Sequence, residues 1–274
     1  MSLKNRNAVI YGAGGSIGGG VAKEFAARGA RVFLTGHHEP ALTKLADEIE
    51  ESGGLAEVAV VDGLDETAVD THAASVVAKA GSIDISLNLV PRGDIQGIPL
   101  VEMSVEDYVR PITTGITTNF ITARAAARHM IAQGSGVILA LDSGSAQGSP
   151  MMGATGSIDA AMDTYIRNLA VEIGPHGVRA LGIWVAGIPE TFTPEKLSAV
   201  NNQLPASPEM VENVLNGLKE ARMTKRSPRL AEVARTLAFL ASDEPRPTCP
   251  SSLRCSTSSP IWRPRSRNRP SSRS

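Results

Sequence analysis

Residues 11–18, YGAGGSIG, decide the fold prediction because they place four glycines between an apolar run and a helical one. The run Asn7–Tyr11 is short and apolar, as in a buried strand, and residues 20–28 have the spacing of a helix. A glycine-rich turn that follows a strand and opens a helix is the context that a dinucleotide-binding fingerprint requires. Taken alone, the same glycines also fit a tight structural turn.

Each position of this loop has a physical role in the predicted site. Gly12 turns sharply where a side chain would clash, while Gly15 and Gly18 let the backbone approach a diphosphate and let the helix pack on the strand. The first amides of the helix face the negative charge, and Ser16 adds a hydroxyl donor beside Ile17. These five residues are predicted to hold the diphosphate of a nucleotide.

Runs typical of strands and of helices alternate along the rest of the chain. The expected strands are 7–11, 30–35, 57–61, 83–88, 136–141 and 178–185, and the expected helices are 20–28, 40–51, 66–80, 105–133, 156–173, 208–221 and 230–242. This alternation predicts an α/β fold with helices on both faces of a parallel sheet. With right-handed crossovers, it becomes a doubly wound, Rossmann-like sheet in a single domain over residues 1–245.

The charges are distributed unevenly between this domain and the last 29 residues. Residues 246–274 contain seven arginines and no acidic residue. Residues 1–245 therefore contain 20 of the 27 basic residues and all 28 acidic ones, which gives this part of the chain a net charge of −8. An acidic body gives no electrostatic reason to expect nucleic acid on the folded domain. No run of about 18 apolar residues is present, which argues against a membrane span. The N-terminus lacks the order of a secretory signal, so we expect a cytoplasmic protein.

Residues 246–274 form a separate tail, rich in Ser, Pro and Arg, which we expect to be disordered. A reading-frame shift, a basic arm for RNA or another anionic partner, and a plain disordered terminus are the three origins that fit it. Both cysteines, Cys249 and Cys255, lie there without the histidine that a zinc spacing needs, so no metal site is predicted.

Several ordered motifs resemble the short-chain dehydrogenase/reductase family over about residues 5–245. Residues 11–18 resemble the family's TGxxxGxG, residues 83–88 (IDISLN) the opening of IDILVNNAG, and residues 169–179 (LAVEIGPHGVR) the run LAxExxPxGIR. Residues 185–191 (VAGIPET) resemble VAPGxIxT, and residues 239–243 read FLASD as in the family. The resemblance implies an oxidoreductase that binds NAD or NADP and acts on a small-molecule substrate.

The resemblance also implies which residues bind the cofactor. Asp62, followed by Gly63, matches the acid that holds the adenine amino group, and the matches Asn88, Gly187, Ile188 and Thr191 lie at the nicotinamide end. A second-strand acid that would repel a 2′-phosphate is missing.

At that second-strand position His37 follows a Thr-Gly pair, where NADP-binding members often carry Arg. A protonated histidine there favours NADP over NAD, whereas the other interpretation of His37 is a solvated turn residue.

The family's proton relay uses a Tyr, a Lys four residues later, a Ser and an Asn. A phenol with a pKa near ~10 is a poor base at neutral pH without a nearby cation. Here the Tyr and Lys positions fall on Thr155 and Asp159, the Asn position falls on Gly115, and only the Ser matches, as Ser143. No lysine occurs between Lys79 and Lys196, so no shift of the alignment restores the pair.

Three functions remain open. The first is an NAD(P)-binding protein with weak or absent dehydrogenase activity. The second is an active oxidoreductase with a non-standard relay of Ser143 with Asp142 or Asp159, since burial can raise the pKa of a carboxyl group. The third is a non-enzymatic interaction protein that has also lost nucleotide binding.

For Asp159 the favoured interpretation is a structural first-turn acid, with Thr155 as the helix N-cap.

Family members commonly form dimers or tetramers through their two long helices. The divergent tail weakens the tetramer expectation and leaves a homodimer.

Overall fold

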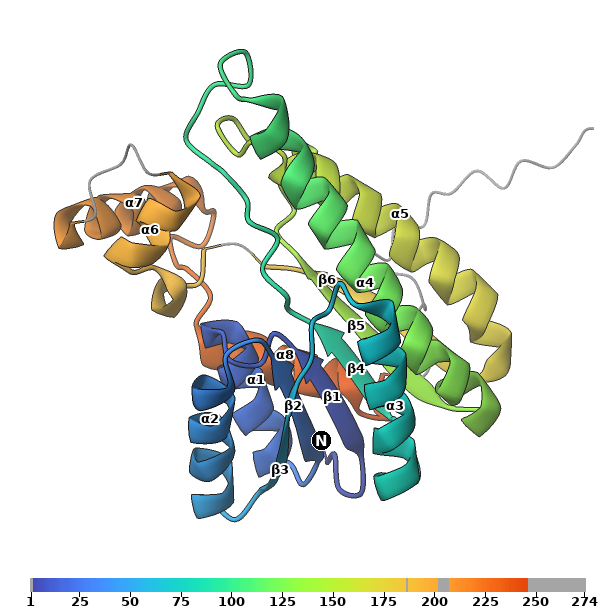
Figure 1. Ribbon diagram of the computed structural model, residues 1–274. Helices are drawn as coiled ribbons and strands as arrows, with labels where there is room; N and C mark the ends of the chain where they lie inside the picture. Colours follow the sequence, from blue (N-terminus) through green and yellow to red (C-terminus); the bar gives the residue numbers. More distant parts are fainter. Residues whose placement is uncertain (1, 186, 202–206, 246–274) are drawn as a thin grey trace, which may run out of the picture.

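The computed structural model describes residues 2–185, 187–201 and 207–245 (Figure 1). Its six strands form one parallel sheet in the order β3-β2-β1-β4-β5-β6. The strands are β1 (Asn7–Tyr11), β2 (Arg31–Gly36), β3 (Leu55–Val60), β4 (Ile85–Asn88), β5 (Gly136–Asp142) and β6 (Val178–Trp184). The strand order reverses between β1 and β4, where ligands bind in open α/β sheets.

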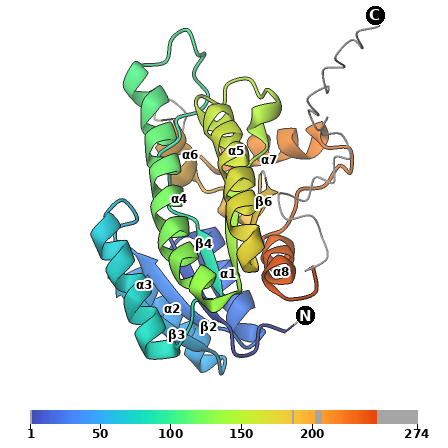
Figure 2. The same cartoon turned by 90° about the vertical axis from the view of Figure 1, so that its right-hand side faces the viewer.

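Helices cover both faces of the sheet (Figures 1 and 2). They are α1 (Ser16–Ala27), α2 (Glu39–Glu51), α3 (Glu66–Ala80), α4 (Val105–Gln133), α5 (Thr155–Ile173), α6 (Pro194–Val200), α7 (Pro208–Ala221) and α8 (Leu230–Ala241). One core cluster joins the sheet to α1, α2 and α8, and a second joins it to α3, α4 and α5. This arrangement confirms the predicted doubly wound α/β fold.

Local capping residues explain where two of the long helices begin and end. Asp65 accepts a hydrogen bond from the Ala68 amide at the start of α3, and Ser104 accepts one from the Asp107 amide at the start of α4. Such caps satisfy amides that have no partner within the helix. Helix α4 ends at Gly134, which has the left-handed φ of 69° that glycine adopts most easily.

The structure corrects the sequence analysis at three helix starts. Helix α1 begins at Ser16 rather than at residue 20, because tertiary packing places its glycines inside the helix. A Cβ on Gly20 would lie 2.8 Å from the Leu230 side chain of α8. Helix α6 was not predicted. Its N-cap is Thr193, whose hydroxyl accepts a hydrogen bond from the Lys196 amide.

The predicted N-cap of α5 was also wrong. Ala154 occupies the cap position and Thr155 begins the helix, where its hydroxyl donates to Asp94 instead of capping the helix.

Residues 246–274, with Cys249 and Cys255, lie outside the described residues, as does Ala186 of the 185–191 motif. Among the described helices, none is long and apolar enough to cross a membrane.

Candidate functional site

A cavity of about 360 Å³ lies where the strand order reverses. Its walls come from the glycine-rich loop, from the segment after β4, from the end of β5 and from the loop that carries α6. The lining residues are Gly12, Gly15, Ser16, Ile17, Gly18, Asn88, Leu89, Val90, Pro91, Arg92, Asp94, Asn119, Leu141, Asp142, Ser143, Val185, Thr191 and Lys196. The structure therefore brings the predicted diphosphate loop and the predicted relay region to one cavity.

Two glycines of the loop are required by the fold itself. Gly12 has a φ of +75°, and a Cβ there would lie 2.4 Å from the carbonyl oxygen of Leu89. A Cβ on Gly18 would lie 2.5 Å from the carbonyl oxygen of Gly12. Gly15 differs, since its Cβ would meet only the Gly12 oxygen, at an ordinary 3.5 Å. The glycine at position 15 thus keeps space open in the cavity rather than relieving a clash within the protein.

The N-terminus of α1 faces this open space, and the helix itself provides no negative group to balance the positive end of its dipole. Gly15 is its N-cap and provides no side chain, and the first turn contains no acidic residue. The amides of the first turn and the positive end of the helix dipole therefore favour an anion in the cavity. Together with the free space at Gly15, this end of the cavity fits the diphosphate of a nucleotide.

The residues predicted for the adenosine end lie outside the cavity lining. His37 and Asp62 follow β2 and β3, and the His37 Nε2 lies 3.3 Å from the Asp62 Oδ1. Asp62 also accepts a hydrogen bond from the Leu64 amide at 2.8 Å. Gly63 follows directly, and a Cβ there would lie 3.1 Å from the Val90 side chain. These positions are grouped at the carboxyl ends of neighbouring strands, as a nucleotide site of this fold requires.

The residues predicted for the nicotinamide end divide into two groups. Asn88 and Thr191 line the cavity, whereas Gly187 and Ile188 do not. The Thr191 hydroxyl donates to the Ile188 carbonyl at 2.8 Å. Asn88 is buried, and its Nδ2 has no partner among the described residues. A buried amide donor without an acceptor is a group that a ligand or a water can satisfy.

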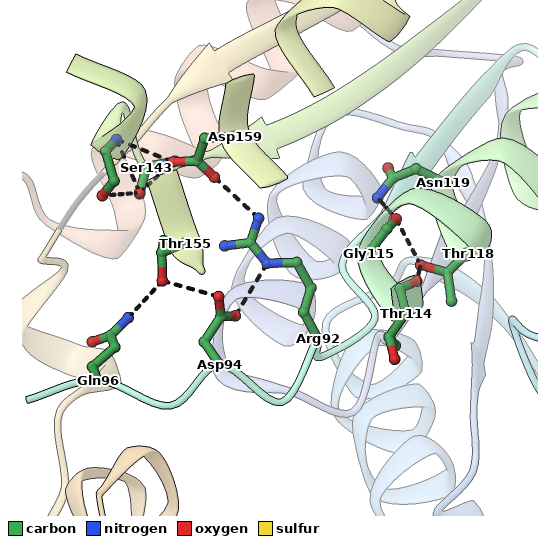
Figure 3. A network of polar contacts seen from close by, with 11 residues as sticks. Arg92, Asp94, Gln96, Thr114, Gly115, Thr118, Asn119, Ser143, Thr155 and Asp159 are labelled. Atoms are coloured by element: carbon green, nitrogen blue, oxygen red, sulfur yellow. Dashed lines mark hydrogen bonds and ion pairs between the residues drawn. The ribbon is translucent and has the colours of Figure 1, made fainter. Parts of the chain in front are cut away.

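At the other end of the cavity, a buried ion pair joins two segments. Arg92, four residues after the end of β4, donates from Nη1 to the Asp159 Oδ1 at 3.0 Å and from Nε to the Asp94 Oδ2 at 3.1 Å (Figure 3). The Asp159 side chain is 1% exposed and that of Arg92 is 18% exposed. Burial acts to lower the pKa of Arg92, but Asp94 and Asp159 together raise it above its ordinary value.

Asp159 accepts hydrogen bonds from four donors. Besides Arg92, its Oδ2 accepts the Ser143 hydroxyl at 2.6 Å and the amides of Ser143 and Ser145, each at 3.1 Å. Hydrogen bonds of donors to a carboxylate, and above all the one from a guanidinium group, are stronger than those between neutral groups. Asp159 thus lies near the start of α5 but not in its first turn, and its side chain is buried and links α5 to Arg92 and to the serine loop that contains Ser143 and Ser145.

The segment after β4 is tied to the start of α5 by a second contact. The Thr155 hydroxyl donates to the Asp94 Oδ1 at 3.0 Å and accepts from the Gln96 Nε2 at 3.2 Å (Figure 3). Gly115 of α4 provides space for the arginine, since a Cβ there would lie 2.8 Å from the Cδ of Arg92. Gly115, Thr155 and Asp159 thus all contact one network built around Arg92.

Sequence reasoning did not identify Arg92 and Asp94. A signal was present, because Asp159 lies on the same helix stripe as Ile158 and Met162, which are buried. A carboxylate on an apolar stripe requires a buried partner. Arg92, which follows the end of β4 at the same edge of the sheet, is such a partner.

Asp142 has a different environment from Asp159. It is buried at the end of β5, it lines the cavity, and its carboxyl group has no hydrogen-bond donor among the described residues. Burial, with the nearby charges of Asp159 and Asp163, raises its pKa from 3.8 to about 8, while Arg92 acts in the opposite direction. The buried position of Asp142 therefore favours the protonated form of its carboxyl group.

No tyrosine lines this cavity in the part of the chain that the structure describes. The Tyr108 hydroxyl pairs with the Ser157 hydroxyl at 2.7 Å, and burial raises the pKa of Tyr165 to about 12. The one lysine of the described lining is Lys196, which contacts the glycine-rich loop and not the region of Ser143. The described residues thus bring no phenol and ammonium together beside Ser143.

Comparison with known proteins identifies the family to which the fold belongs. The family model described as "Enoyl-(Acyl carrier protein) reductase" matches residues 12–249. L-rhamnose 1-dehydrogenase (NAD(P)(+)) of Azotobacter vinelandii is 30% identical over 258 residues, which cover 90% of this chain and 93% of that protein. The chain belongs to the short-chain dehydrogenase/reductase family.

Other members of the short-chain dehydrogenase/reductase family show the same relationship. The 7alpha-hydroxysteroid dehydrogenase of Escherichia coli K12 is 30% identical over 184 residues, covering 67% of this chain and 71% of that protein. The crystal structure of an NAD+-bound xylitol dehydrogenase covers 92% of this chain and 98% of its own, with a TM-score of 0.79 at 24% identity. The structural likeness supports the fold.

The two kinds of glycine in the loop lead to a matched pair of variants. Gly15→Ala should change the free energy of unfolding by less than about 1 kcal/mol, because its Cβ meets no close neighbour. It should weaken binding of ADP-ribose, the diphosphate-bearing part of a nicotinamide dinucleotide, at least ~tenfold, or about 1.4 kcal/mol. Gly18→Ala should lose about 1–3 kcal/mol of stability through its clash. Urea unfolding and titration calorimetry measure both; unchanged affinity in Gly15→Ala would contradict the assignment.

The raised pKa of Asp142 predicts a pH-dependent stability. Between about pH 4 and pH 8 the folded state holds a proton that the unfolded state has released, so the group's contribution to stability falls as pH rises and then levels off. Asp142→Asn should therefore match the wild type near pH 4 and exceed it by on the order of a few kcal/mol at pH 9.

The exposed carboxylate of Asp47 on α2 provides the control for this experiment. Asp47→Asn should shift the unfolding free energy by the same small amount at both pH values. Chemical denaturation at pH 4, 7 and 9 measures all three proteins. A stability difference between Asp142→Asn and the wild type that does not grow with pH would show that Asp142 ionises at its ordinary pKa.

Proposed function

We propose that this short-chain dehydrogenase/reductase binds a nicotinamide dinucleotide and has weak or no dehydrogenase activity of the usual kind. The Arg92–Asp159 pair is the observation on which this proposal depends. In the alignment implied by the motifs, Asp159 occupies the position of the family's relay lysine and Thr155 that of its tyrosine. A carboxylate held by four donors takes the place of an ammonium group.

The orientation of Ser143 supports the same conclusion. Its hydroxyl has one proton, which it donates to Asp159 at 2.6 Å, and its oxygen lies 2.7 Å from the Ser145 hydroxyl. The proton that would be donated to a substrate oxygen is thus already used within the protein. Ser143, proposed as the remaining catalytic residue, acts here as a link between its own loop and α5.

The departures from the family pattern support one another. Gly115 replaces the relay asparagine and leaves room for Arg92, while Asp159 pairs with that arginine and Thr155 binds its second partner, Asp94. Each change in isolation would leave a clash or an unpaired buried group. Their combination leaves the network satisfied, so we infer that this end of the cavity was rebuilt as a structural anchor.

The nucleotide end supports binding. When bound, a nicotinamide dinucleotide supplies a carbon centre that accepts or donates hydride. Gly12, Gly15 and Gly18 with the α1 N-terminus would hold its diphosphate, and Asn88 and Thr191 face the cavity toward its nicotinamide end. The absence of an acid after β2, with His37 in that place, leads us to propose a preference for NADP over NAD.

A second function is favoured by Asp142. A neutral carboxylic acid that lines the cavity can donate a proton to a carbonyl oxygen, so an active oxidoreductase with a non-standard relay remains a candidate. Asp142 is the better proton donor of the two acids considered, because the oxygens of Asp159 are occupied by donors. An interaction protein without nucleotide binding is the third candidate, and the open diphosphate loop argues against it.

We also propose that the protein forms a homodimer. The long helices α4 and α5 lie side by side on one face of the molecule (Figure 2) and expose apolar side chains. Val105, Val109, Phe120 and Ile131 of α4 and Val171 of α5 are between 37% and 80% exposed. Burying such a patch against a second copy removes apolar surface from water.

The proposal is tested by measuring binding and turnover separately. Titration calorimetry should detect NADPH and NADH binding with micromolar to submillimolar affinity, NADPH binding more tightly, and a panel of carbonyl substrates should give no absorbance change at 340 nm above the buffer rate. Binding of neither nucleotide at millimolar concentration would leave the interaction protein. Turnover that disappears in Asp142→Asn and persists in Asp47→Asn would establish the non-standard relay instead.

A further inference from the structure

Lys196 connects the segment after β6 to the glycine-rich loop. Its Nζ donates to the Ser16 Oγ at 2.6 Å, although the two residues are 180 positions apart. Ser16 is the first residue of α1, and both residues line the cavity. The ammonium group of Lys196 is therefore held beside the place where the proposed diphosphate would bind.

The charge of Lys196 has no counter-ion among the described residues. Its partner there is a neutral hydroxyl group, and no described carboxylate forms an ion pair with it. Partial burial lowers its pKa, as expected for a cation that gives up water without gaining an anion. The first turn of α1 also lacks an acid. The positive end of the α1 dipole and the ammonium group of Lys196 therefore lie at one cavity, and neither is paired with a carboxylate among the described residues.

Lys196 is presented by a docked helix rather than by a free loop. The Thr193 hydroxyl caps α6, and Leu197 in its middle is buried. At the far end of the helix, the Val200 carbonyl accepts the Gln96 amide at 2.8 Å. Just before α6, Glu190 pairs with Arg229 at 2.9 Å. These contacts restrict the position from which the lysine reaches the cavity.

We propose that Lys196 is a diphosphate ligand, which leaves the Ser16 hydroxyl and pairs with the phosphate oxygens when a dinucleotide binds. The inference rests on the proposed nucleotide binding and adds a residue to it. An ammonium group paired with a phosphate forms a charge-assisted hydrogen bond, which is stronger when both partners are charged than the present contact with a neutral hydroxyl group. Helix α6 then closes the cavity through a contact that only a diphosphate-bearing ligand provides.

The test compares Lys196→Gln with the wild type by titration calorimetry, with ADP-ribose and NADPH as the ligands. Lys196→Gln should bind both about tenfold more weakly, and its affinity should fall less steeply with added NaCl because one phosphate contact is lost. Lys196→Arg should keep most of the wild-type affinity. Lys219→Gln, an exposed lysine of α7, should bind both ligands like the wild type.

The outcomes separate this inference from the proposed function. Equal affinity and equal salt dependence in Lys196→Gln and the wild type would refute the role of Lys196 and leave nucleotide binding intact. Failure of the wild type itself to bind either ligand at millimolar concentration would refute both. Thermal unfolding of each variant verifies that affinity is compared between folded proteins.

Discussion

A guanidinium group buried against a carboxylate is the interaction on which the centre of this molecule depends. Moving two charges out of water costs several kcal/mol per ion, which is recovered only when the geometry is good and the remaining oxygens are satisfied. Both conditions hold for Arg92 and Asp159, since the serine loop after β5 supplies three further donors to Asp159. The segment after β4, the serine loop and the start of α5 are joined by this one pair.

The two ends of the cavity consequently have opposite characters. At the Arg92 end, Arg92 is paired with both Asp94 and Asp159, and the Ser143 hydroxyl is turned toward Asp159. The Asp142 carboxyl group is the exception there, because it has no donor among the described residues. At the loop end, the first turn of α1 contains no acid, and the ammonium group of Lys196 contacts a neutral hydroxyl group with no carboxylate paired to it among the described residues. On the cavity wall, the buried Nδ2 of Asn88 has no acceptor in the described part of the chain. Unsatisfied polar groups indicate where a ligand belongs, and satisfied ones indicate where the protein has already completed its own structure. The proposed binding without the usual proton transfer rests on this division.

Patterns of short range made the fold predictable from the sequence. Strand β1 and the glycine loop after it can be recognised within about ten residues. Helix α4 was expected at residues 105–133, and the structure shows a serine cap and a left-handed glycine at the two ends of that run. The start of α1 was misplaced because glycine is unfavourable inside a helix, and one of its glycines, Gly20, packs against Leu230, which is distant in the sequence. The same limit applies to the candidate site.

The proposed loss of the relay rests on positions 155 and 159 of the sequence, whereas the contacts that these residues make could not be predicted from it. Arg92 and Asp159 are separated by 67 positions, and nothing local in the sequence pairs them. Lys196 is farther still from Ser16, and the helix that presents it is only seven residues long. Contacts of this kind depend on the packed sheet, so they became visible only in the three-dimensional structure.

A double-mutant cycle between Arg92 and Asp159 tests the central claim most directly. If the pair is a buried structural anchor, Arg92→Met and Asp159→Asn should each lower the free energy of unfolding by about 3–5 kcal/mol, since the first leaves the Asp159 carboxylate without its cation and the second leaves Arg92 with Asp94 as its one remaining carboxylate among the described residues. The double variant should then be more stable than the sum of the single losses implies, by at least ~1 kcal/mol. Urea denaturation at pH 7 measures all four proteins. Single losses below ~0.5 kcal/mol that simply add would contradict the account.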